Sequence, residues 1–118
     1  MTADEFRRIA LSFTETEERS HMGHPDFRVR GKIFATLAHP EGEWGMVKLS
    51  PEEQQNYLDA APEVFTPASG KWGIQGATMV RLKAAKKTLV KKAMEAAWRL
   101  GHERSVARGK RRSGAPGA

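Results

Sequence analysis

The first apolar positions of the chain recur at the spacing of an α-helix, which predicts a helix with one apolar stripe. The stripe consists of Phe6, Ile9, Ala10 and Phe13. Thr2 and Glu5 have the spacing of a capping box, so we expect the helix to begin after Thr2. The acidic positions 15, 17 and 18 follow, and a charge run of this kind is typical of a solvated loop.

The next segment predicts a turn and two short strands joined by a tight hairpin. Pro25 forces the residue before it into an extended conformation, so residues 21–25 are expected to turn. Residues 27–29 and 33–37 are rich in aromatic and β-branched side chains, and Gly31 between them supplies the positive φ of a two-residue turn. The cross-strand pairs that this turn predicts are Val29 with Lys32 and Phe27 with Phe34.

Alternation along this hairpin leaves open which face is buried. Regular strands place Phe27, Val29, Phe34 and Thr36 on one face, and Arg28, Ile33, Ala35 and Leu37 on the other. Both faces are half apolar. One of them must pack on the helices, and the other then needs a cover or a ligand.

A third strand and a second helix are predicted next. Residues 39–43 form a turn, and residues 44–49 alternate enough to form the strand. Ser50, Pro51 and Glu53 then have the pattern of a helix start, with an N-cap, a proline at the first position and the acidic partner of a capping box. We expect this helix to stop at Pro62.

The remaining third of the chain predicts a loop, a last strand and a long helix. Residues 63–69 are expected to be loop because Pro67 breaks a strand, and residues 77–82 form the strand. The helix covers residues 84–100 and is amphipathic. Its apolar arc holds Ala85, Leu89, Val90, Ala93, Ala96, Ala97 and Leu100, with the lysines mostly opposite.

This order of elements predicts an α+β fold. It is a two-layer sandwich, in which a mostly antiparallel sheet packs against the N- and C-terminal helices. A chain of 118 residues forms one domain, which we place at residues 1–101. Apolar residues become rare afterwards, so we expect residues 102–118 to be a basic tail that is disordered from Gly109.

Charge indicates an acidic partner, and nucleic acid is the first candidate. The net charge is +6 and the isoelectric point is about 10.0. Residues 101–118 contribute five basic side chains against Glu103, which leaves a net charge of +2 on the rest of the chain. The chain has no cysteine, the first residues do not resemble a signal peptide, and the longest apolar run cannot span a bilayer. A cytoplasmic protein without a membrane role is expected, and a monomer is favoured.

The segment from His24 to Leu37, HPDFRVRGKIFATL, resembles the diagnostic segment of the MmcQ/YjbR family of small bacterial proteins. The segments 50–55 (SPEEQQ) and 70–73 (GKWG) also match, as does a long helix ending around Ala97 and Trp98. The resemblance covers residues 2–105. It implies a frataxin-like (CyaY-like) two-layer fold and DNA binding through a double wing of β-hairpins, with no catalytic residues. Two features depart from the family: Ala77 stands where an aromatic residue is common, and the basic tail lies outside the pattern.

The candidate nucleic-acid contacts centre on the basic hairpin. Phosphate contacts of this kind orient a protein on DNA without selecting a sequence. The hairpin supplies Arg28, Arg30 and Lys32, and the patch is extended by Lys48, Lys71, Trp72, Arg81 and Lys83. The alternative is ordinary edge-strand charge, which blocks aggregation. The arginines and lysines of the tail can add a non-specific arm.

The sequence gives little support for a metal site, a phosphate-binding loop or a catalytic site. His21 and His24 near Asp26 resemble a metal pair, but no third ligand stands at a fixed spacing, so we expect a local role in the turn. The glycines at 70, 73 and 76 lack the ending of a phosphate-binding loop and precede a strand. No catalytic motif, metal or cofactor is therefore predicted, and the chain is not expected to be an enzyme.

Three hypotheses follow from the sequence. The first is a DNA-binding protein, and the second is a small protein- or ligand-interaction module that uses the uncovered sheet face near Phe27, Phe34 and Trp44. The third is a metal-handling protein by analogy with the frataxin-like fold, although the acidic residues that it needs are sparse.

Overall fold

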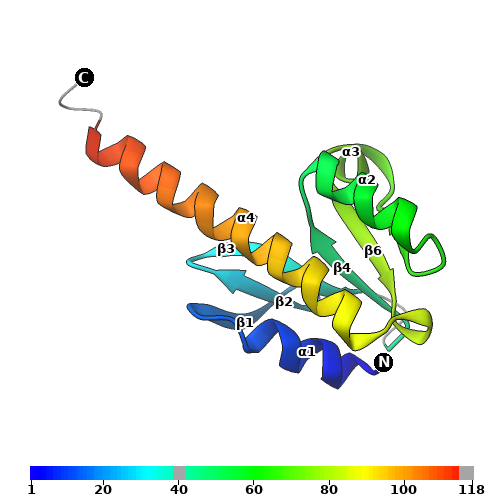
Figure 1. Cartoon of the computed structure of the whole chain (residues 1–118). Helices are drawn as coiled ribbons and strands as arrows, with labels where there is room; N and C mark the ends of the chain where they lie inside the picture. The colour runs from blue at the N-terminus through cyan, green and yellow to red at the C-terminus, as the bar shows by residue number, and fades with distance from the viewer. Residues whose placement is uncertain (39–41, 115–118) are drawn as a thin grey trace.

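The computed structural model describes the backbone of residues 1–38 and 42–114, and the side chains of residues 1–38 and 42–105 (Figure 1). The chain folds into helices and strands in the following order: α1 (Ala3–Leu11), β1 (Thr16–His21), β2 (His24–Val29), β3 (Lys32–Ala38), β4 (Trp44–Lys48), α2 (Pro51–Ala60), β5 (Phe65–Pro67), α3 (Gly70–Ile74), β6 (Ala77–Arg81), the 3₁₀ turn η1 (Leu82–Ala84) and α4 (Lys87–Gly114).

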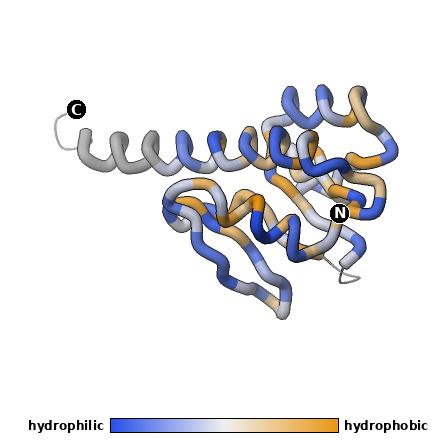
Figure 2. Tube along the Cα trace, turned by 60° about the horizontal axis from the view of Figure 1, so that its bottom comes forward, coloured by the Kyte–Doolittle hydropathy of each residue, from blue (hydrophilic) through white to orange (hydrophobic). Residues whose placement is uncertain are grey.

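The strands form one antiparallel sheet in the order β1-β2-β3-β4-β6-β5. Helices α1 and α4 lie on one face of it, and α2 and α3 lie together beside the β4–β6 side (Figure 1). Hydrophobic and hydrophilic residues alternate along the sheet and helices (Figure 2), and the buried apolar side chains of both layers form one core. The predicted α+β class and the antiparallel sheet packed against the terminal helices are confirmed.

Both predicted helix starts are present. The Thr2 hydroxyl accepts from the Glu5 backbone and the Glu5 carboxylate accepts from the Thr2 backbone, which completes the capping box of α1. At α2 the Ser50 hydroxyl accepts from the Glu53 N–H at 3.1 Å. Glu5 also pairs with Lys87 at the start of α4; these hydrogen bonds lower the pKa of Glu5 to about 2.

The observed register of the hairpin differs from the predicted one because β3 contains a β-bulge. The turn itself is as expected, because Arg30 and Gly31 both have positive φ and Val29 pairs with Lys32. The register then shifts by one residue, so Phe27 pairs with Ala35, and the predicted pair with Phe34 is wrong. The register skips Phe34, which is the extra residue of the bulge.

The bulge decides which face of the central strands is buried. An extra residue places Phe34 and Ala35 on the same side, where Phe27, Val29 and Leu37 also join the core under α1 and α4. The opposite face carries Asp26, Arg28, Ile33 and Thr36. The two half-apolar faces expected from simple alternation are therefore replaced by one apolar face and one mixed face.

The acidic run after α1 is part of a strand and not a solvated loop. Residues 16–21 form the edge strand β1, which pairs with β2 along its whole length. The turn that joins them lies at Met22 and Gly23, both with positive φ, so His24 and Pro25 belong to β2 and not to a turn. Glu18 faces α1, where its carboxylate accepts from Arg7 at 2.9 Å.

Two further elements, one of them inside the expected loop at residues 63–69, were not predicted. Phe65–Pro67 forms the edge strand β5, which tolerates Pro67 because an edge position needs no ladder N–H on its outer side. Gly70–Ile74 forms the short helix α3, where no helix was predicted. A Cβ on Gly73 would lie 1.8 Å from the Ala68 carbonyl, so this close turn requires glycine.

Helix α4 begins later and ends later than predicted. It starts at Lys87, after η1, and continues through Gly101 to Gly114. Residues 109–114, expected to be disordered, are helical, and residues 115–118 lie outside the described part. The division of the chain at residue 101 stays a prediction, although the helix crosses it without a break. Part of the expected turn, residues 39–41, is also outside the described residues.

The core allows a direct test through Phe6, which is fully buried on α1 and packs 6.2 Å from the Phe27 ring, centroid to centroid. Replacing Phe6 with alanine leaves a cavity, and we expect the free energy of unfolding to fall by about 3–5 kcal/mol. Leu11→Ala on the same helix, at a residue that is 42% exposed, should change it by no more than about 0.5 kcal/mol. Urea titration measures both. Equal small losses in the two variants would contradict the packing described.

Candidate nucleic-acid interface

Among the predicted contact residues, Arg28 has a structural role. It lies on the mixed face of β2, where its guanidinium donates to both carboxylate oxygens of Asp26 at 2.8 and 3.1 Å. Asp26 is completely buried, and its second oxygen is 2.7 Å from Nδ1 of His21 on β1. The hydrogen bonds from Arg28 and then from His21 lower the pKa of Asp26, against the opposing effect of burial. Arg28 therefore neutralises a buried carboxylate and is not available to phosphate.

The other two cations of the hairpin are placed differently from each other. Arg30 at the turn is exposed, and its Nε lies 3.4 Å from the Glu15 carboxylate. Lys32, at the start of β3, lines a cavity together with residues from β4 and α4. The predicted basic hairpin thus separates into a buried ion pair, an exposed ion pair and one residue at a cavity.

This cavity, of about 130 Å³, forms where β3 and β4 diverge below α4. The two strands pair from Ala38 with Trp44 to Ala35 with Val47 and no further. The bulge at Phe34 bends the start of β3 away from the end of β4. The lining residues are Lys32, Ile33, Lys48, Ala97, Leu100, Gly101 and Arg104. We refer to it as the cationic cavity, since three of its residues are basic.

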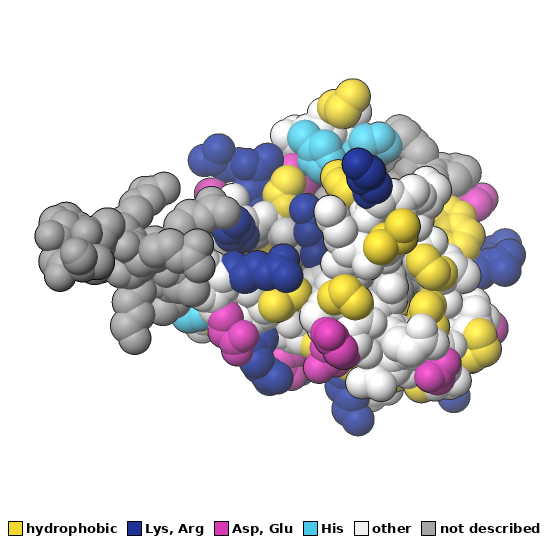
Figure 3. Space-filling model, turned by 90° about the horizontal axis from the view of Figure 1, so that it is seen from above, with side chains coloured by type: hydrophobic (Ala, Val, Ile, Leu, Met, Phe, Trp, Pro, Cys, Tyr) yellow, Lys and Arg dark blue, Asp and Glu magenta, His cyan; other side chains and the backbone are white. Residues whose placement is uncertain are grey.

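Helix α4 closes over the cavity because Gly101 permits a close approach. A Cβ at this position would lie 2.9 Å from Cγ1 of Val29 and 3.7 Å from Cβ of Phe34. Figure 3 shows lysine and arginine side chains gathered around a hollow beside the C-terminal half of α4. The helix therefore brings Arg104 to the same cavity as Lys32 and Lys48.

Lys48 is the central cation of the group. Its Nζ lies 5.3 Å from the centre of the Trp72 ring on α3, a cation–π contact. Burial, and to a smaller extent Arg104, lowers the pKa of Lys48. Within the described residues no carboxylate forms an ion pair with Lys48 or Arg104. The two charges are thus held near each other without an opposite charge.

Arg81 and Lys83 belong to a different part of the surface. Arg81 pairs in register with Trp44, at the opposite end of β4 and β6 from Lys48, and its guanidinium lies 5.9 Å from the Trp44 ring. With Glu43 these residues line a separate pocket of about 210 Å³. The four-residue separation along β4 is about 13 Å. Lys71 is exposed and precedes Trp72 on α3.

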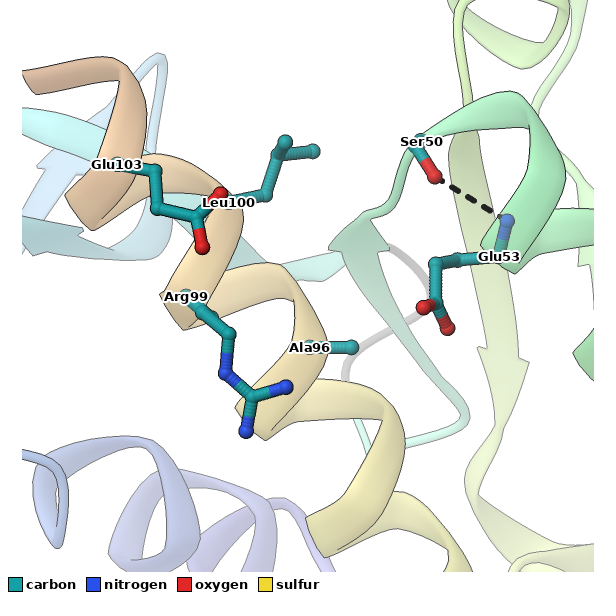
Figure 4. Close-up of a pocket in the computed structure, with 6 residues that line it drawn as sticks. All are labelled: Ser50, Glu53, Ala96, Arg99, Leu100 and Glu103. Carbon is teal, nitrogen blue, oxygen red and sulfur yellow. Dashed lines mark hydrogen bonds between the residues drawn. The ribbon is translucent and has the colours of Figure 1, made fainter. Parts of the chain in front are cut away.

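A neighbouring hollow of about 230 Å³ between α4 and the start of α2 has mixed charge. Ser50, Glu53, Ala96, Arg99, Leu100 and Glu103 line it. Figure 4 shows Glu53 across the gap from Ala96, with its neighbour Ser50 bonded to the backbone of α2. Two carboxylates against one guanidinium do not favour an anion, and Arg99 is also 3.5 Å from Glu95.

The histidines of the β1–β2 turn take part in local contacts. The rings of His21 and His24 are 6.3 Å apart, and Asp26 holds His21. In the part of the chain with described side chains, no three histidine or acidic side chains converge on a point that would hold a metal ion. No helix of the described chain is long and apolar enough to cross a membrane.

Arg104 and Gly101 are site residues that sequence reasoning missed. Gly101 follows the predicted end of the helix at residue 100, and Arg104 lies beyond the predicted end of the domain at residue 101, so Arg104 was assigned to the tail. The signal was nonetheless present in the spacing. Ala97, Gly101 and Arg104 stand four and three residues apart, which is one face of a helix that continues past Leu100.

Together these features define a small α+β domain with an antiparallel sheet, helices over one face and a cationic cavity at one end of the sheet. The model of the YjbR family matches residues 11–100, and the chain belongs to this family. The fold is similar to the crystal structure of Deinococcus radiodurans protein DR2400, which contains the domain DUF419. The TM-score is 0.69 at 16% identity, over 84% of this chain and 77% of that one. No curated protein matches the sequence.

The buried carboxylate predicts a pH-dependent effect of Asp26→Asn. At pH 7 the variant leaves the half-buried Arg28 without its counter-charge, so we expect about 3 kcal/mol less stability. The pKa of Asp26 is lower in the folded state, so its contribution is complete above about pH 4 and is lost as the pH falls through the folded value.

Urea unfolding of the parent and the variant at pH 7 and near pH 2 checks this, and the difference between them should shrink at the lower pH. Asp4→Asn is the matched control, because the Asp4 side chain is 75% exposed and pairs with Arg7 at the surface. A difference between parent and Asp26→Asn that is independent of pH would contradict the assignment.

Proposed function

We propose that this protein binds DNA by contacting the phosphate backbone at the mouth of the cationic cavity. One observation carries the proposal. Lys32, Lys48 and Arg104 come from three separate elements and line one cavity, and in the described residues no carboxylate pairs with Lys48 or Arg104. Cations gathered in this way attract a polyanion, and phosphate contacts supply most of the affinity of non-specific binding.

The proposed contact surface differs from the one predicted from the sequence. Lys32, Lys48, Lys71 and Trp72 remain in it, and Arg104 is added. Arg28 is excluded because it neutralises the buried Asp26, and Arg81 and Lys83 lie at the other end of the sheet. Arg30 is at the hairpin tip, where Glu15 competes with phosphate for its guanidinium.

The alternatives have less support. The interaction-module hypothesis needed an open apolar pocket near Phe27, Phe34 and Trp44, but Phe27 and Phe34 are completely buried in the core. The metal hypothesis needed free acidic residues. Glu15, Glu17 and Glu18 instead pair with Arg30, Arg19 and Arg7, respectively. The proposal includes no catalytic step.

The salt dependence of binding tests this function. We expect a fluorescent DNA oligonucleotide to bind with an affinity that falls linearly with salt on logarithmic axes. Lys48→Met removes a phosphate contact and should reduce the slope by about 1. Lys83→Met removes the same charge at the other end of the sheet and should leave the slope unchanged. Fluorescence anisotropy at several salt concentrations measures both variants. No binding at low salt, or equal losses in the two variants, would refute the proposal.

The distal end of α4 needs its own control. A chain that ends at Ser105 keeps Arg104 and loses four basic side chains, Arg108, Lys110, Arg111 and Arg112. We expect this chain to bind DNA more weakly, with a smaller slope, and to remain sensitive to Lys48→Met. If the truncated chain binds no DNA at low salt, the binding belongs to the terminal segment and not to the cationic cavity.

A further inference from the structure

We propose that the cationic cavity holds a single phosphate group and that Trp72 stacks on the base beside it, so that the protein binds DNA strands that are unpaired at this point. This inference rests on the proposed DNA binding and narrows it to one class of nucleic acid.

The size and lining of the cavity fit a phosphate group. Its volume of about 130 Å³ has room for a tetrahedral phosphate group. Cations are present at the wall of the cavity, and Ala97 and Leu100 of α4 supply apolar surface. The phosphate enters, and the rest of the nucleotide stays outside.

The charge of the cavity favours an anion of this kind. Lys48 is half-buried and shares the cavity with Arg104. Burial and then Arg104 lower the pKa of Lys48, and in the described residues no carboxylate forms an ion pair with it. A phosphate placed between them accepts charge-assisted hydrogen bonds from both side chains and raises the pKa of Lys48 again.

Trp72 provides the second part of the recognition. Its side chain lies on the outer surface of α3 and is 53% exposed, which is unusual for a large aromatic residue. Lys48 is near one side of the ring, with its Nζ 5.3 Å from the centre. The residue that binds the phosphate therefore also contacts the stacking platform. Lys48 therefore joins the two subsites.

An exposed aromatic ring beside a phosphate site distinguishes an unpaired strand from a duplex. Aromatic side chains stack on bases whose faces are free, as in proteins that bind single strands. In a duplex, neighbouring base pairs cover those faces, so Trp72 contributes nothing there. The cationic cavity alone binds both forms of DNA. The difference in affinity between the unpaired strand and the duplex therefore measures the contribution of the Trp72 ring.

The test compares three DNA ligands of equal charge at one salt concentration. They are an oligothymidine strand, the same backbone without bases, and a blunt duplex with the same number of phosphates. We expect the parent protein to bind the oligothymidine about tenfold more tightly than the other two ligands. Trp72→Leu should remove this preference, and Trp72→Phe should restore most of it. Binding to the duplex should not change in either variant.

The controls separate stacking from loss of fold or charge. Ile74→Ala alters a more exposed apolar residue of the same short helix, at 78% exposure, and should have no effect on any ligand. Lys48→Met should lower the affinity for all three ligands by the same factor. Quenching of tryptophan fluorescence by oligothymidine should disappear in Trp72→Leu, although Trp44 and Trp98 remain, and unchanged melting temperatures would show that the variants are folded.

Two outcomes overturn the inference in different ways. If the duplex and the oligothymidine bind equally well and Trp72→Leu changes neither, the protein binds phosphate without stacking; the proposed function stands and the inference falls. If none of the three ligands binds at low salt, both are refuted.

Discussion

One extra residue in β3 determines both the core and the site. Without the bulge at Phe34, regular alternation would divide the apolar residues of β3 between the two faces of the sheet, and neither face would make a continuous core. With it, Phe34 and Ala35 join Phe27, Val29 and Leu37 under α1 and α4. The same bulge bends the start of β3 away from β4, and the cationic cavity lies in the resulting gap. Packing and binding surface therefore have a common origin.

Charge in this protein divides into pairs that hold the fold together and cations that remain available. The buried Asp26 is compensated by Arg28 and His21, and Glu15 and Glu18 pair with Arg30 and Arg7 on neighbouring elements. These pairs remove from the hairpin most of the positive charge that its sequence displays. Lys48 and Arg104 have no such partners in the described residues, so the local charge at the cavity is more informative than the net charge of +6.

The fold was predictable where local chemistry decides the structure, and not where long-range packing does. The caps at Thr2 and Ser50 and the turn at Gly31 were predicted because neighbouring residues fix them. The bulge was not, because alternation assumes a regular strand. Strand β1 was missed because an acidic run on an edge strand resembles a loop until its pairing partner is known. The cavity required the fold, since the three elements that build it are far apart in the sequence.

We propose that DNA binds at the cationic cavity, and not at the basic hairpin or the end of α4. An NMR titration of the ¹⁵N-labelled full chain with oligothymidine tests this directly, because it reports on every backbone amide and on the indole N–H of Trp72. We expect the largest shifts at Lys32, Lys48, Gly101 and Arg104 and at the Trp72 indole. Shifts concentrated at Arg28, at Arg81 and Lys83, or confined to residues 106–118, would contradict it.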